Sequence, residues 1–152
     1  MKKLVLIGLL STFGFSASAG TLLEVSRVDG FTPNPSTQTI NVDQNTGVVT
    51  SVTTTEHGNA PITTTTVLAQ LSKAGLKNLK TKIVAATDAN GTLEDQQPDQ
   101  PKCSDAPTFE INVSKGSGLV TVFKSYSCHT FKFKDGLADD VVAIAEGFFE
   151  LR

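Results

Sequence analysis

Apolar and polar positions alternate with a period of two in several stretches of this chain. Ile40 and Val42 alternate with polar neighbours, turn residues follow, and a threonine-rich stretch continues from Val48 to Glu56. Alternation of this kind around an Asp/Asn/Gly-rich turn predicts a β-hairpin. The stretch 62–71 is again β-branched and predicts a strand whose threonines face water. The stretches that predict strands and their turns are 21–30, 39–56, 62–71, 108–114, 119–127 and 130–136.

Two other stretches repeat their apolar residues at helical spacing. Ser72 suits an N-cap, and Leu76, Leu79 and Ile83 then fall on one side of a helix. Near the C-terminus the apolar positions recur every three or four residues, at Leu137, Val141, Ile144, Phe148 and Leu151. Hairpin strands followed by a helix, twice over, predict the α+β class. We expect a two-layer sandwich, an antiparallel sheet with two amphipathic helices packed on one face.

The stretches 108–114 and 119–127 predict a second hairpin, and this hairpin brings the two cysteines of the chain close together. If Gly116 and Ser117 form its two-residue loop, Lys115 faces Gly118 and Ile111 faces Val122. This register continues to place Cys103 and Cys128 on one face, a diagonal step of about 7 Å apart. A disulfide needs Cα atoms at roughly 4.4–6.8 Å, so a small adjustment suffices. The register therefore predicts a disulfide between Cys103 and Cys128.

His129 directly follows the second cysteine, which raises the alternative of a Cys–His catalytic pair. Neighbours on a strand point to opposite faces, so Cys128 and His129 cannot serve one another there, and a paired sulfur is no nucleophile. We therefore predict that His129 is a bystander and that the chain has no catalytic residues of this kind. Neither zinc-ligand spacing nor the key carboxylates of a calcium loop are present, and we expect no metal or cofactor.

The N-terminus has the three parts of a secretory signal peptide. Lys2 and Lys3 precede a short apolar run, and Ala17-Ser18-Ala19 is a small-residue cleavage motif. We predict a signal peptide over 1–19 and one α+β domain over 20–152, exported to the periplasm or secreted, without membrane insertion. Removal of 1–19 leaves 11 basic against 15 acidic side chains, a net charge of −4. This charge argues against nucleic acid as a partner.

The segment 88–107 is an acidic, proline-rich loop, and long connections of this kind are often functional. The residues proposed to contact a partner are Glu94, Asp95, Gln97, Pro98, Asp99 and Pro101. The function that we predict is protein binding, with another exported protein as the partner. One alternative is a peptidase inhibitor that uses the loop 94–107, since a preformed loop binds without a large ordering cost. A second alternative is an enzyme whose site is assembled from distant residues. The pattern does not specify an oligomeric state.

Overall fold

The computed structural model describes residues 20–30, 32–57, 60–88, 91–104, 106–134 and 136–151. The predicted signal peptide, residues 1–19, lies outside these ranges. In chain order the elements are β1 (Thr21–Val28), β2 (Ser36–Asp43), β3 (Val48–His57), β4 (Ala60–Gln70), α1 (Lys73–Asp88), β5 (Leu93–Asp95), β6 (Thr108–Lys115), β7 (Gly118–Tyr126), β8 (His129–Phe133) and α2 (Asp139–Phe148).

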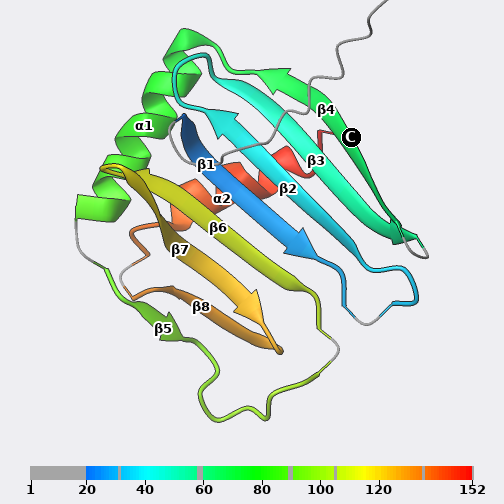
Figure 1. Ribbon diagram of the computed structural model, residues 1–152. Helices are drawn as coiled ribbons and strands as arrows, with labels where there is room; N and C mark the ends of the chain where they lie inside the picture. Colours follow the sequence, from blue (N-terminus) through cyan, green and yellow to red (C-terminus); the bar gives the residue numbers. More distant parts are fainter. Residues whose placement is uncertain are drawn as a thin grey trace, which may run out of the picture.

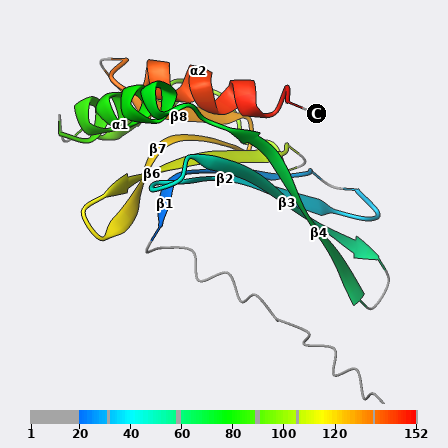
Figure 2. The same ribbon diagram turned by 90° about the horizontal axis from the view of Figure 1, so that it is seen from above.

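The strands form one eight-stranded antiparallel sheet in the order β4-β3-β2-β1-β6-β7-β8-β5 (Figure 1). Strands that are consecutive in the chain lie side by side in β1–β4 and in β6–β8, and β1 pairs with β6 where the two groups join. β5 is added at the edge beside β8. Both helices lie on the same side of the sheet, as Figure 2 shows. The predicted α+β class, with two helices on one face of an antiparallel sheet, is confirmed. Among the described residues, no helix is long and apolar enough to cross a membrane.

The core lies between the helices and the centre of the sheet. β1, β2 and β6 supply most of the buried apolar side chains that the sheet contributes, because they occupy the middle of the strand order. The largest fully buried side chains are Leu23, Ile40, Leu79, Ile83, Ile111, Val25, Val42, Val49, Val113, Val122 and Val141. Full burial of a Val, Leu or Ile side chain stabilises by about 1.5–3 kcal/mol, so this central cluster contributes most to the stability of the fold.

The first helix, α1, has the N-cap and the apolar face that the sequence predicts. The hydroxyl of Ser72 accepts a hydrogen bond from the N–H of Gly75 at 3.0 Å, so Ser72 is the predicted N-cap. Leu79 and Ile83 are buried, and Leu76 packs against the core cluster. The apolar face predicted from the spacing is therefore the face that the helix buries.

The second helix is shorter than its sequence pattern predicts. Its buried residues are Val141, Ala145 and Phe148. Leu137 and Leu151 lie beyond its two ends and are 39% and 45% exposed, so including them in the buried face was wrong. The helical spacing of apolar residues in the sequence extends to Leu137 and Leu151, but the helix itself spans only Asp139–Phe148.

The β6–β7 hairpin has the predicted register near its turn and a different one further on. Lys115 pairs with Gly118, but Ile111 pairs with Phe123 rather than with Val122. The register shifts between Ile111 and Asn112, which marks a β-bulge on β7. Val122 is the extra residue, and its side chain is fully buried. The bulge therefore fits one more apolar side chain into the core.

Candidate functional site

The segment predicted as a loop, 88–107, contains an edge strand. β5 pairs with β8, with Leu93 opposite Phe133 and Asp95 opposite Phe131. The attachment continues past the strand, because the N–H of Gln96 donates to the C=O of Thr130 at 2.8 Å. The prediction of an irregular segment was wrong for these residues, since the pairing partner β8 lies far along the chain.

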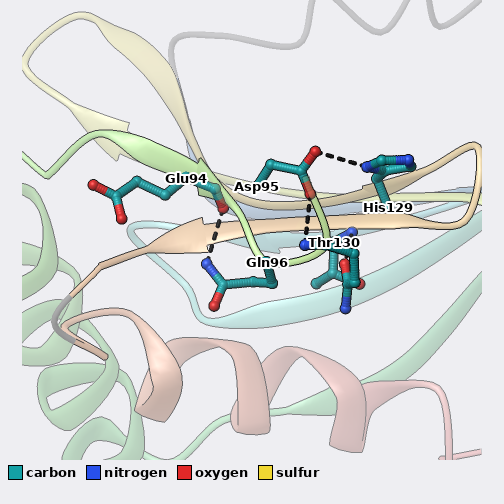
Figure 3. A network of polar contacts seen from close by, with 6 residues as sticks. Glu94, Asp95, Gln96, His129 and Thr130 are labelled. Carbon is teal, nitrogen blue, oxygen red and sulfur yellow. Dashed lines mark hydrogen bonds and ion pairs between the residues drawn. The ribbon is translucent and has the colours of Figure 1, made fainter. Parts of the chain in front are cut away.

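Asp95 of β5 and His129 of β8 form a pair that links the two strands. Nδ1 of His129 lies 2.6 Å from Oδ2 of Asp95, and Figure 3 shows the carboxylate pointing at the imidazole. An ionised carboxylate only accepts hydrogen bonds, so Nδ1 carries the proton. The side chain of His129 is 3% exposed. The prediction that His129 is a bystander was wrong, because its imidazole anchors β5 to β8.

Asp95 also orders the chain that follows it. Its Oδ1 accepts the N–H of Gln97 at 2.9 Å. Partial burial acts to raise the pKa of Asp95, but the hydrogen bonds from Gln97 and His129 and the charge of Lys102 outweigh it and hold this pKa below its usual value. The carboxylate is therefore ionised near neutral pH. Gln97 adds a second anchor, because its Oε1 accepts the N–H of Thr130 at 2.8 Å.

A disulfide fixes the other end of the segment. Cys103 and Cys128 are bonded, with Cα atoms 5.7 Å apart, so the predicted pairing is confirmed. The N–H of Cys103 also donates to the C=O of Ser127 at 3.1 Å. Cys128 lies in the turn between β7 and β8 with φ +67°, and not on a strand as predicted. The tight turn at Ser127 and Cys128 therefore joins the strands and carries the bridge.

These contacts define a loop held at both ends, residues 96–103, which we call the anchored loop. The N–H of Gln100 donates to the C=O of Gln97 at 3.1 Å, which forms a turn in its middle. Its tip, residues 98–102, is exposed throughout. A tip that projects into solvent between two fixed ends is available for contact with another molecule.

The six residues predicted to contact a partner divide into two groups. Glu94 and Asp95 belong to β5, and the side chain of Gln97 is engaged with β8. Pro98, Asp99 and Pro101 lie at the exposed tip. The sequence does not distinguish these two groups among the six residues. It also gives no local signal for the role of His129, because the aspartate against which this histidine is buried lies in a distant segment.

The Asp95–His129 pair does not present a catalytic base in this conformation. Its remaining nitrogen, Nε2, is buried and has no hydrogen-bond partner within the described ranges. A general base must reach the proton that it removes, and a buried Nε2 cannot meet a substrate. Cys128 is paired, so it supplies no thiolate. The Asp95–His129 pair and the disulfide are instead suited to holding the two ends of the anchored loop in place.

Hollows also lie elsewhere on the sheet. One, of about 610 Å³, is lined by Glu24, Asn41 and Asp43 among threonines and valines. Another, of about 490 Å³, is lined by Arg27, Gln38 and several hydroxyl side chains. In the described part of the chain, no three His, Cys, Asp or Glu side chains gather so that they could hold a metal ion.

The chain matches no family model, and a search of curated proteins finds no significant relative.

Proposed function

We propose that this protein is an exported protein-binding module that presents the tip of the anchored loop, Pro98–Lys102, to another exported protein. The observation that carries the proposal is the contrast between the fixed ends of the loop and its exposed tip. Fixing a loop before binding removes much of the entropy that association would otherwise cost, so a partner gains affinity from a small contact. Within the described residues, Asp99 has no hydrogen-bond or ion-pair partner, which leaves its charge available for a basic group.

The disulfide supports the export part of the proposal. Disulfides persist in oxidising compartments such as the periplasm and the extracellular space. The sequence of residues 1–19 supplies the matching signal, with Gly20 as the first residue of the mature chain. Intact mass and N-terminal sequencing of the protein from its native envelope or medium test this. A chain that retains residues 1–19 contradicts export by cleavage.

The binding role is tested by replacing residues 98–102 with Gly and Ser. Proteins crosslinked to the mature chain in envelope extract are identified, purified and titrated against it. We expect the variant to lose binding while its disulfide and its unfolding midpoint stay unchanged. A matched control replaces another exposed turn, Gly116–Ser117, with Asn-Gly and keeps binding. A partner that binds the Gly/Ser variant equally well contradicts the proposed role of the loop.

The second candidate function is peptidase inhibition by the same loop. The observation that favours it is that the exposed residues Pro101 and Lys102 directly precede Cys103, which the disulfide holds in place. The test is the residual activity of exported serine, cysteine and metallopeptidases with stoichiometric amounts of the protein. Inhibition that disappears in the 98–102 variant supports this candidate, and unaffected peptidases exclude it for the enzymes tested.

A further inference from the structure

The two edges of the sheet differ in how well they are protected against pairing with another strand. At one edge β5 has three residues and includes Glu94 and Asp95, and short acidic edges resist further pairing. At the other edge β4 has eleven residues, Ala60–Gln70, and none of them is charged. Natural proteins seldom leave a long uncharged edge strand free, because its unpaired N–H and C=O groups accept further strands.

The middle of β4 has no protective device. Pro61, which cannot donate a hydrogen bond, lies at the start of the strand. Near the end of β4, its pairing with β3 shifts register between Val49 and Thr50. Between them the run Ile62–Val67 is regular and exposed. Ile62 is 59% exposed and Val67 is 65% exposed, so the edge also presents apolar surface.

We infer that β4 pairs antiparallel with β4 of a second copy of this chain and joins two sheets into one. The run Ile62–Val67 consists only of threonine and β-branched apolar residues, so it has neither a charge nor a proline that opposes pairing with its own copy. Antiparallel pairing of two identical strands has two-fold symmetry, in which both copies use the same surface. Every second residue of an edge strand turns its N–H and C=O outward, so the pairing also satisfies these groups.

The side chains of the run are compatible with this pairing. A two-fold axis at Thr65 places Val67 opposite Thr63 of the second copy on one face, and Thr64 opposite Thr66 on the other. The existing β3–β4 pair has the same kind of contact, since Oγ1 of Thr54 lies 3.0 Å from Oγ1 of Thr63. The proposed interface therefore repeats a contact that the fold already makes.

Charges beside the strand favour the antiparallel arrangement. Glu56 pairs with Pro61 at one end of β4, and Lys73 begins α1 just beyond the other end. Both side chains are exposed. Antiparallel pairing brings the end that carries Glu56 toward the end that carries Lys73 in the second copy, whereas parallel pairing brings like charges together. This complementarity makes a second copy the occupant that we choose over an unrelated peptide.

The test is the mass of the mature protein in solution, measured by light scattering or sedimentation over a range of concentrations. We expect twice the mass of one chain, falling to one on dilution. Thr65→Lys places two like charges together at the axis, and juxtaposed like charges weaken association by several kcal/mol, or about a hundredfold or more. The control Thr92→Lys, at an exposed residue beside the other edge, keeps the dimer.

A crosslinking experiment keeps the proposal testable if a lysine disturbs the strand. Under mild oxidation Thr65→Cys should form a covalent dimer faster than Thr92→Cys, while the native disulfide stays intact. Slowed exchange of alternate amides in 62–67 at high concentration would add support. A wild-type chain that stays monomeric at every concentration measured overturns the proposal. Binding of an unrelated extended peptide to β4 would not rescue it, because the proposed partner is a second copy of the chain. A Thr65→Lys dimer as tight as the wild type also overturns it. Because the anchored loop is on the other half of the sheet, loop binding and dimer formation fail independently.

Discussion

The disulfide between Cys103 and Cys128 should contribute stability that can be calculated from its position. It links residues with a sequence separation of 25. The chain-entropy relation for a loop of this length gives about 12 cal/mol/K, or about 3.5 kcal/mol at 25 °C. Replacing both cysteines with alanine should therefore lower the free energy of unfolding by about 3.5 kcal/mol. For a domain of this size the melting temperature should fall by about 10 °C.

The measurement is urea unfolding followed by circular dichroism, with the wild type under oxidising conditions as the reference. A second variant separates the effect of the crosslink from that of the turn. Cys128 has φ +67°, a conformation that costs a non-glycine residue roughly 1–2 kcal/mol. The pair Cys103→Ala with Cys128→Gly should therefore be about 1 kcal/mol more stable than the pair with two alanines.

Two results would refute this reasoning. A loss below about 1 kcal/mol in the double-alanine variant would mean that the crosslink barely restricts the unfolded chain, against the chain-entropy account. Equal stability of the alanine and glycine variants at position 128 would mean that the turn relaxes when the bridge is absent. A reduced wild-type protein that unfolds like the double-alanine variant would confirm that the bond, and not the sulfur atoms, is responsible.

Three further predictions concern single side chains. The lowered pKa of Asp95 means that its charge stabilises the fold above the unfolded pKa and that this contribution disappears as pH falls through the folded value. The gap in unfolding free energy between wild type and Asp95→Asn should therefore be full near neutral pH and begin to narrow as the pH falls below about 4, the pKa of an unfolded aspartate; a gap independent of pH contradicts this. Gly91→Ala places a Cβ 2.8 Å from the ring of Phe133, so the urea midpoint should fall by an amount equivalent to about 1–3 kcal/mol; an unchanged midpoint would show that the ring moves freely. Lys82 pairs with Asp140 at the surface, so Lys82→Ala should cost less than about 1 kcal/mol, and a larger loss would mean that the pair contributes more than exposed ion pairs do.

The elements that the sequence predicts well are those whose signals are local. The turn before Val48 and the loop at Gly116 each lie between stretches with alternating polarity, so the hairpins could be assigned from neighbouring residues. Ser72 caps a helix whose apolar residues follow at regular spacing. The disulfide was also predictable, because two cysteines near one hairpin have few other partners.

The parts that escaped prediction depend on residues that meet only after folding. The strand β5 is three residues long and contains two acids, so it has no pattern of its own and is defined by its pairing with β8. The burial of His129 arises because Asp95 arrives from a distant segment. The bulge at Val122 depends on packing beneath the sheet, and alternation along β7 alone does not indicate it.

The pairing of β1 with β6 has a consequence for the order in which the molecule assembles. Leu23, near the start of β1, pairs with Val113 of β6, and both side chains are buried at the centre of the sheet. Each half of the sheet can form from neighbouring segments, but the seam between them closes only when most of the chain is present. Pairings between such distant segments slow folding because a long loop must close first. We therefore expect an incomplete chain to remain open along β1 until the segment that contains β6 has been made.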